Sequence, residues 1–433
     1  MRYSKLLCGF FLLFIPFFSQ AQGIELDGKK EIIWRDFLGV NAHFLWFTPA
    51  QYAQQISLLQ DLGIEWTRVD LHWDRHELAQ GDYRLTELDL LVSTLEQEKI
   101  KSVMYLVGSA AHATSAPKHS ATPDQYPPKD PVLFANMMTH LVQRYPSVNA
   151  WQVWNEPNLP AFWRPSEDPQ GYGRLLMSTV NQVRQVNPDV QLVMAGMAYY
   201  SQMPVKGGLM LEALGKLGVA QLNATAAYHP YTHYPEGNER NKHDFLVHSQ
   251  QLNNLISSAN LPIWATEWGW SSYQGPEEHQ AIIGEHGQAD FVLRRLALMT
   301  ALDYEKVFLF ALSDLDQRAS LRDQSYGLLD MQGSPKPVYH ALKRFLETTG
   351  SRLIPGRKPQ LLEKPNDLYS VSWQREDGKN LWMFWSASEK GVSLSSIDTA
   401  LLVDPISGTS TTVNADQQRL KLRTKSSLQI LVW

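Results

Sequence analysis

Between residues 32 and 350, short apolar runs alternate with longer amphipathic stretches, and this alternation strongly limits the folds available to the chain. The apolar runs are rich in β-branched and aromatic residues, and eight have the length of strands: 37–44, 66–71, 102–107, 150–154, 191–195, 224–228, 263–266 and 307–312. Helical spacing occupies the stretches between them, at 49–60, 86–97, 131–145, 171–186, 243–258 and 286–302. Strands that alternate with helices predict βαβ units with parallel strands.

Eight strand–helix units predict an α/β fold of the (β/α)8 TIM-barrel type. The last unit ends in a turn at 329–333 and a helix at 337–347. A doubly wound sheet is the main alternative, but no Gly-rich phosphate loop follows the early strands. Four loops that follow strands are long and rich in aromatic residues or proline: 108–130, 158–169, 229–241 and 314–326. In a barrel these loops lie at the carboxyl ends of the strands, where active sites form.

The chain has 433 residues, so two domains are expected. From residue 351 the sequence changes to short strand-like runs, and those at 368–373 and 380–385 flank an Asp377-Gly378 hairpin turn. These features predict a barrel over 22–350 and a small antiparallel β-sandwich over 351–433. Residues 23–34 could add a strand to the sandwich or cover the bottom of the barrel.

The first residues have the features of an export signal. Arg2 and Lys5 precede an apolar run of 13 residues at 6–18, and small residues follow it at 19–21. The run is short compared with the ~20 residues of a membrane-spanning helix, although an uncleaved membrane anchor is the alternative. We therefore expect a signal peptide over 1–21 and a periplasmic or secreted protein. Cys8 is the only cysteine, so the mature chain would have no disulfide and no thiol-based site.

Charge and aromatic content narrow the class of partner. The net charge is −5 and no long run of Lys or Arg occurs, which argues against a nucleic-acid partner. The 14 Trp and 17 Tyr residues supply flat faces on which sugar rings stack, and these point to a polysaccharide substrate. The alternative is that the rings fill the interior of a large barrel.

Two glutamates carry the strongest chemical signal. Glu156 lies in Asn155-Glu156-Pro157 at the end of the fourth predicted strand, and Glu267 lies in Thr266-Glu267-Trp268 at the end of the seventh. In a barrel both emerge at the same rim, facing each other across its mouth. One carboxyl can then protonate a glycosidic oxygen while the other attacks the anomeric carbon, at ~5–5.5 Å separation for a retaining enzyme. The alternative, a purely structural role for the pair, fits this placement poorly.

The two strings resemble those of the clan A glycoside hydrolases. Arg68 and His229-Pro230-Tyr231 also match the clan pattern, as does the exit from 327 to 339. Within the clan the chain is most similar to family 39, and to the Psl-type bacterial endoglycosidases that cleave the cell's own exopolysaccharide. The resemblance implies that Glu156 is the acid/base and Glu267 the nucleophile, with no cofactor and no metal. Two segments depart from the pattern: 308–314 lacks the usual Trp, and 109–112 replaces a Pro-x-Trp.

The resemblance and the chemistry together suggest supporting roles. Asn155 resembles the residue that binds the sugar 2-hydroxyl, and Arg68 and Tyr231 could stabilise ionised Glu267. We expect His229 to orient this network, and an apolar wall and the opposing carboxylate to raise the pKa of Glu156. Candidate stacking platforms are Trp46, Trp163, Trp268 and Trp270. His229 and His233 could suggest a metal pair, but no third ligand motif lies nearby, so a structural histidine is favoured.

These observations leave three candidate functions. The first is an endoglycosidase acting within a polysaccharide, motivated by the glutamate pair and the long rim loops. The second is an exo-glycosidase that removes terminal sugars such as xylose or an uronic acid. The third is a carbohydrate-binding or assembly protein of an exopolysaccharide export complex, whose contact with the membrane would be limited to an uncleaved signal segment.

Overall fold

The computed structural model describes residues 23–239, 243–276 and 280–433. Eight parallel strands close into a barrel, and each overlaps a strand predicted from the sequence. In chain order they are β3 (Leu38–Asn41), β4 (Trp66–His72), β7 (Lys101–Val107), β8 (Ala150–Asn155), β9 (Gln191–Met197), β10 (Ala226–His229), β11 (Ile263–Trp268) and β12 (Lys306–Leu309). The predicted (β/α)8 barrel is therefore confirmed.

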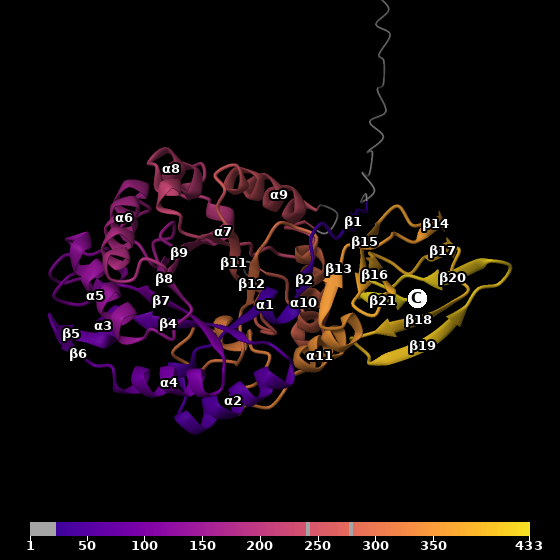
Figure 1. Ribbon diagram of the computed structural model, residues 1–433, viewed down its shortest axis with the longest axis horizontal. Coiled ribbons are helices and arrows are strands. Elements are labelled where there is room, and N and C mark those ends of the chain that lie inside the picture. The colour runs from indigo at the N-terminus through magenta and orange to yellow at the C-terminus, as the bar shows by residue number, and fades with distance from the viewer. Residues whose placement is uncertain (1–22, 240–242, 277–279) are drawn as a thin grey trace, which may run out of the picture.

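Helices surround the barrel (Figure 1). They are α2 (Pro49–Asp61), α4 (Thr86–Gln97), α5 (Pro131–Arg144), α6 (Pro169–Val186), α8 (Met210–Lys216), α9 (Asp244–Ser257), α10 (Gly284–Thr300) and α11 (Pro337–Thr349). Local chemistry fixes several starts: Thr48 and Gln51 form a capping box on α2, and the Asp130 side chain accepts from the Val132 amide on α5. The short α8 is not among the predicted helices, because seven residues barely show a helical period.

The lower end of the barrel is filled by an apolar plug. Seven strands each contribute one inward side chain to it: Trp66, Val103, Ala150, Val193, Ala227, Trp264 and Phe308. The eighth strand contributes Gly39, where a Cβ would lie 2.5 Å from the Phe308 ring. The absent side chain thus makes room for the phenylalanine, and the plug supports the site above it.

Residues beyond 350 form the predicted β domain, with two packed antiparallel sheets. The larger sheet has the order β19 (Thr409–Asn414), β18 (Thr399–Asp404), β21 (Gln429–Val432), β16 (Asn380–Ser386), β15 (Leu368–Arg375), β13 (Arg352–Ile354) and β2 (Ile32–Ile33). The smaller sheet is β14 (Gln360–Glu363), β17 (Gly391–Ser395) and β20 (Arg419–Arg423). Apolar residues from both, including Trp382, Phe384 and Leu420, form one buried cluster between them.

Strands β1 and β2 show where residues 23–34 belong in the fold. β1 (Glu25–Asp27) pairs in parallel with β15, and β2 pairs with β13. β1 and β2 thus extend the sheet of the β domain. The first residues of the range 22–350 therefore belong to the sandwich and not to the barrel. The predicted signal peptide at 1–21 lies outside the described residues. Within the described ranges, no helix has both the length and the apolar content needed to cross a membrane.

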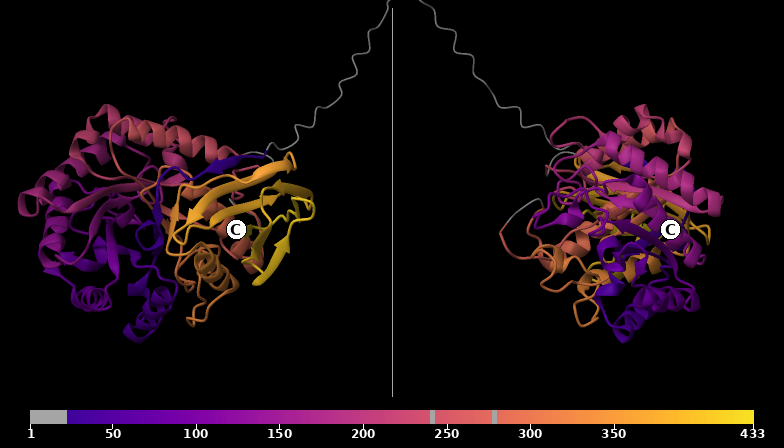
Figure 2. Two further views of the ribbon diagram at one scale, coloured as in Figure 1. Left: turned by 45° about the vertical axis from the view of Figure 1, so that its right-hand side comes forward. Right: turned by 90° about the vertical axis from the view of Figure 1, so that its left-hand side faces the viewer.

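The β domain packs against α10 and α11 on one side of the barrel (Figures 1 and 2). Trp373 Nε1 donates to Thr300 Oγ1 at 3.1 Å, and Arg344 of α11 donates to the carbonyls of Pro405 and Ile406 at 2.7 and 2.9 Å. A third contact reaches toward the rim, where Trp385 Nε1 donates to Glu236 Oε1 at 2.8 Å. The sandwich therefore supports a rim loop as well as the barrel wall.

Candidate active site

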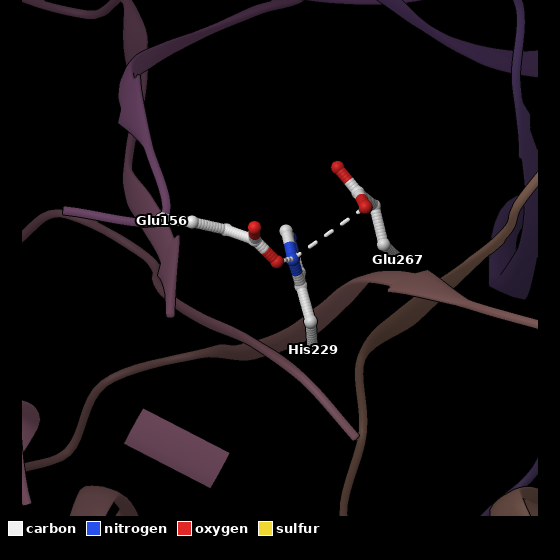
Figure 3. Close-up of side chains that lie close together, drawn as sticks. All are labelled: Glu156, His229 and Glu267. Carbon is white, nitrogen blue, oxygen red and sulfur yellow. Dashed lines mark hydrogen bonds and ion pairs between the residues drawn. The ribbon is translucent and has the colours of Figure 1, made fainter. Parts of the chain in front are cut away.

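Glu156, His229 and Glu267 meet at the upper mouth of the barrel, each from a different strand end (Figure 3). The Nδ1 atom of His229 lies 2.7 Å from Glu156 Oε1 and 3.6 Å from Glu267 Oε2. One oxygen of each carboxyl and one nitrogen of the histidine all lie within 4.8 Å of one another. This separation fits the ~5–5.5 Å of a retaining glycosidase and leaves no room for the water that an inverting pair must hold.

A local distortion of β8 aims Glu156 inward. Trp154 and Glu156 both have left-handed backbone angles, with φ of 76° and 39°. Between them Asn155 keeps its register with Gly196, whose carbonyl accepts from the Glu156 amide at 2.9 Å. Such angles cost about 1–3 kcal/mol for each non-glycine residue, and they occur where function fixes a side chain.

A bulge in β11 sets the direction of Glu267. Ala265 pairs with Val307, and Trp268 pairs with Leu309, so two residues of β11 face a single residue of β12. The extra residue breaks the strict alternation of a strand and lets consecutive side chains point into the barrel. Thr266 and Glu267 both use this: Thr266 Oγ1 lies 3.0 Å from His229 Nε2, and Glu267 Oε1 lies 2.7 Å from Arg68 Nη1.

Arg68 is the centre of the polar layer beneath the two glutamates. It is 1% exposed, and its guanidinium lies 3.8 Å from the centre of the Tyr105 ring. It donates hydrogen bonds of 2.6, 2.8, 2.7 and 2.8 Å to Gln152 Oε1, Asn41 Oδ1, Glu267 Oε1 and Asn155 Oδ1. A buried, hydrogen-bonded cation stabilises the ionised carboxylate of Glu267. Tyr231 adds a hydroxyl that donates to Glu267 Oε2 at 3.2 Å.

The hydrogen bonds around His229 assign its tautomer. Gln152 turns its Oε1 to Arg68, so its amide Nε2 donates to Met194 O at 2.9 Å and to Thr266 Oγ1 at 3.3 Å. Thr266 accepts from Gln152, and His229 Nε2 is the acceptor that its own proton reaches among the described residues, so we assign Thr266 as the donor to His229 Nε2. His229 then carries its proton on Nδ1 and donates it to Glu156 Oε1. The proton of the Glu156 carboxylic acid consequently resides on Oε2, free for transfer.

Burial shifts the pKa values of Glu156 and His229 away from their ordinary values. It raises the pKa of Glu156 to about 8; Arg68 opposes this rise and the charge of Asp323 adds to it. Burial also lowers the pKa of His229 to about 4, with Glu267 opposing and Arg68 reinforcing the change. Burial is thus the main cause of the raised pKa of Glu156, but the added negative charge is that of Asp323 and not of the opposing glutamate. Near pH 7 Glu156 is an acid and His229 is neutral.

Some residues essential to this geometry escaped sequence analysis. A Cβ at Gly196 would lie 2.0 Å from His229 Nε2 and 2.5 Å from Thr266 Oγ1, so only glycine fits there. Asn41, Gln152 and Thr266 are 2%, 0% and 0% exposed. Each is a polar residue within a strongly apolar strand, and that is the signal that could have identified them, because buried polar groups need partners.

The glutamates open into a cavity of about 560 Å³. Of the predicted site residues, five line it: Trp46, Asn155, Glu156, Tyr231 and Glu267. Loops 158–169, 229–241 and 314–326 supply much of the remaining wall, whereas loop 108–130 supplies none of the lining residues. Asp70, His72, Tyr199, Arg322 and Asp323 also line the cavity and were not predicted.

The stacking role expected for three tryptophans is wrong. Trp163, Trp268 and Trp270 are 2%, 0% and 1% exposed, and none lines the cavity. Trp163 packs edge-on against Trp154, and Trp270 Nε1 donates to the Thr232 carbonyl at 3.1 Å. The loops that carry Trp163 and Trp270 bury both rings against the barrel, so neither ring has an exposed face on which a sugar could stack. Trp46 alone of the four retains an accessible position on the wall.

The three central side chains are also the described group of His and acidic residues that could share a metal ion. His233 is not a member, so the pair considered from sequence does not form. Both carboxyl groups are already engaged, Glu156 by the His229 N–H and Glu267 by Arg68 and Tyr231. A metal ion would stand next to the buried guanidinium, and like charges at that range repel. The donor set therefore suits organic acid/base chemistry better than metal binding.

Comparison with known proteins agrees with this geometry. The family model for glycosyl hydrolases family 39 matches residues 25–358. A β-xylosidase from Geobacillus stearothermophilus is 26% identical over 305 residues, covering 65% of this chain and 56% of that protein, so the chain spans little more than half of this curated relative.

Solved structures show the same fold. A family 39 glycoside hydrolase from the gut symbiont Bacteroides cellulosilyticus superposes with a TM-score of 0.71 at 21% identity, covering 93% of this chain and 82% of that one. A monomeric β-xylosidase from Caulobacter crescentus gives 0.64 at 16% identity, over 95% and 99% of the two chains. With the family model matching most of the sequence, the chain belongs to glycosyl hydrolase family 39.

Proposed function

We propose that this protein is a retaining, endo-acting glycoside hydrolase whose substrate is a polysaccharide made by the producing cell. The observation that carries the chemistry is the pair Glu156 and Glu267. One oxygen of each lies within 4.8 Å of the other, burial raises the pKa of Glu156, and Arg68 donates a hydrogen bond to Glu267. An exported location belongs to the same proposal and is supported by the sequence of residues 1–21.

The reaction proceeds in two displacements. Glu267 attacks the anomeric carbon while Glu156 passes the proton on Oε2 to the glycosidic oxygen, whose bond to that carbon breaks. The sugar is then held as an ester of Glu267, and the rest of the chain departs. Glu156, now ionised, removes a proton from water, and the resulting hydroxide displaces Glu267 to release a product of retained configuration.

Neighbouring groups act on these steps. Asn155 Oδ1 is occupied by Arg68, so its Nδ2 amide is available on the cavity wall to donate to the sugar 2-hydroxyl. That hydrogen bond strengthens as charge develops at the anomeric carbon, which is the condition for catalysis. The neutral His229 donates to Glu156 throughout, so the acid can ionise without a rearrangement of its partners.

The extent of the cavity supports endo action. A second hollow of about 340 Å³ adjoins the first, and Trp46, Asp70 and His72 line both. A polysaccharide would need such a hollow beside the cavity for sugars beyond the one being cleaved. Exo action is the second candidate, and the similarity to β-xylosidases favours it.

Product size tests the proposal. The purified protein is incubated with the exopolysaccharide of its producing organism, with Glu267→Gln as control, and products are separated by size. Oligosaccharides formed only by the wild type support endo action. Release of monosaccharides alone from this polymer, or from a panel of xylans and xylo-oligosaccharides, would assign exo action instead.

A further inference from the structure

Strand β4 carries a row of polar side chains that runs from beneath the nucleophile to the wall of the cavity. Arg68, Asp70 and His72 are alternate residues of β4 and point to the same side. Arg68 holds the nucleophile, and Asp70 lies two residues nearer the rim, about 6–7 Å further along the strand. That is the scale of one sugar ring, so Asp70 faces the part of the glycone remote from its anomeric carbon.

Asp70 is buried yet incompletely bonded. It is 5% exposed, and its Oδ2 accepts from Trp46 Nε1 at 3.3 Å and lies 3.5 Å from His72 Nε2. Its Oδ1 is buried with no hydrogen-bond partner among the described residues. A buried carboxylate oxygen without a donor is costly, which indicates that a donor arrives with a ligand. Burial alone would raise the pKa of Asp70, but His43, His72 and Trp46 together hold that pKa well below its ordinary value.

The charge of the cavity limits what that ligand can be. Among the described residues, four carboxyl residues line it, Asp70, Glu156, Glu267 and Asp323, and Arg322 is the one lining arginine or lysine. Arg322 lies beside Asp323, with Nε and Oδ1 3.8 Å apart, and both act on the ionisation of Tyr199 and Tyr326. Arg68 does not line the cavity and is fully engaged beneath it. Among the described residues, no arginine or lysine pairs with Asp70, and Arg75 and Arg84 line the adjoining hollow rather than this cavity.

We propose that Asp70 makes the glycone subsite selective for a neutral sugar, whose hydroxyl groups donate to its carboxylate, and against a sugar that carries a carboxylate of its own. An ionised carboxyl accepts hydrogen bonds from hydroxyls and repels a second anion. The proposal rests on the glycosidase function above and narrows it, because an uronic acid becomes an unsuitable glycone whether the enzyme acts within the chain or at its end.

Matched pairs of substrates test the selectivity. Nitrophenyl glucoside and glucuronide differ only in the group at carbon 6, and galactoside and galacturonide form a second pair; nitrophenyl xyloside serves as a third neutral probe. Both anomers are assayed with the full protein. We expect kcat/KM for the neutral member to exceed that for the uronide by about 100-fold or more, the discrimination typical of an unpaired or repelling buried polar group.

Asp70→Asn tests the residue itself. The amide keeps the shape and removes the charge, so kcat/KM for the neutral sugar should fall about tenfold to 100-fold, and the neutral-to-uronide ratio should fall at least tenfold. A merely structural role would lower both rates and leave the ratio unchanged. Trp46→Phe, which spares the carboxylate, should keep the ratio. Asp89→Asn is the matched control, since it neutralises an aspartate paired with Arg144 on the outside of the barrel. Thermal unfolding verifies that each variant folds.

The outcomes separate this inference from the endo proposal. A neutral preference that collapses in Asp70→Asn supports it, even if only monosaccharides are released from polymers and endo action fails. Equal turnover of uronide and neutral partner by the wild type overturns it, as does an unchanged ratio in Asp70→Asn. If no aryl glycoside is cleaved, binding of neutral and uronate-containing oligosaccharides to Glu267→Gln replaces turnover. Failure to bind any neutral chain there also overturns the inference.

Discussion

The two ends of the barrel use the same strands for opposite purposes. At the lower end, Trp66 of β4, Ala150 of β8, Ala227 of β10 and Trp264 of β11 pack into the apolar plug. Two residues further along each strand, the inward side chain is polar: Arg68, Gln152, His229 and Thr266. Each pair differs by one step of the strand repeat, so the same backbone geometry supports stability at one end and chemistry at the other.

The difference lies in what burial does. Removing apolar side chains from water stabilises the plug by roughly 25 cal/mol for each Å² buried. The polar layer above it gains nothing from burial itself and is tolerated because nearly every group is hydrogen-bonded. In exchange, burial keeps a proton on Glu156 near pH 7 and leaves His229 neutral. Substitutions at the two ends should therefore separate activity from stability.

The largest effect is expected at Glu267. Glu267→Gln removes the nucleophile and should lower kcat/KM by at least about 10⁴-fold, since no other carboxylate can form the covalent intermediate. The melting temperature should change little, because the amide oxygen can still accept from Arg68 while the amide NH2 group donates to the Tyr231 hydroxyl oxygen. Steady-state kinetics and thermal unfolding check both parts, and a variant that retains a tenth of wild-type turnover would refute the assignment.

Glu156→Gln should follow, with a loss of about 10²–10⁴-fold in kcat/KM. The loss should shrink for aryl glycosides with strongly acidic leaving groups, which need no protonation. In the wild type, the acid form disappears as pH rises through about 8, so kcat/KM should fall above that pH. The variant should lack this alkaline limb. A wild-type profile that falls already between pH 4 and 5, the ordinary range of a glutamic acid, would contradict the raised pKa.

At the lower end, Phe308→Ala should show the reverse pattern. Phe308 is fully buried in the plug, and its truncation should lower the free energy of unfolding by about 3–5 kcal/mol. The kcat of the folded protein should stay close to the wild-type value, because no residue of the polar layer is altered. Denaturant unfolding and kinetics below the melting transition measure the two. Phe308→Leu is the control that leaves a smaller cavity. A loss of kcat in Phe308→Ala without a loss of stability would contradict the separation of stability and activity between the two ends of the barrel.

A smaller effect is expected for Thr266→Val, which removes the hydroxyl that fixes the tautomer of His229. The loss of one hydrogen bond, about 0.5–1.5 kcal/mol, should lower kcat by up to roughly tenfold and shift the alkaline limb assigned to Glu156. Thr67→Val is the matched control, since Thr67 is equally buried but donates to the Lys101 carbonyl of the neighbouring strand. Similar pH profiles for both variants would argue against the proposed chain of hydrogen bonds.

The smallest effect should come from chelation. Because the carboxyl groups are engaged by Arg68, Tyr231 and His229, EDTA should leave kcat and KM unchanged. Inactivation by EDTA, with recovery on adding a divalent ion, would assign the three central side chains to a metal instead.

The comparison of the two ends also explains what sequence could predict. Eight strand patterns alternate with helical patterns, so the barrel could be predicted from this alternation, and Glu156 and Glu267 could be predicted from motifs at strand ends. The bulge that turns Glu267 inward beside Thr266 leaves no mark in the sequence, because it depends on the pairing of β11 with β12. Asp70 was missed for a related reason. Its buried Oδ1 lacks a hydrogen-bond partner among the described residues, and that depends on how residues distant in the sequence pack around it.

The tryptophans mark the limit of composition. A ring in a loop can face a sugar or pack beneath the loop, and the sequence does not distinguish these outcomes. Trp163 and Trp270 pack beneath their loops, whereas Trp46 reaches the cavity wall. The path of each loop is decided by distant contacts, such as the hydrogen bond from Trp385 of the β domain to Glu236.

Covalent trapping would show whether Glu267 is the nucleophile. The protein is incubated with a dinitrophenyl glycoside of a neutral sugar in which fluorine replaces the 2-hydroxyl, which slows breakdown of the intermediate more than its formation. Intact mass followed by peptide mapping locates the adduct. We expect one sugar bound covalently per chain, on Glu267, and no adduct on the Glu267→Gln variant. An adduct on Glu156, or product of inverted configuration with no adduct at all, would contradict it.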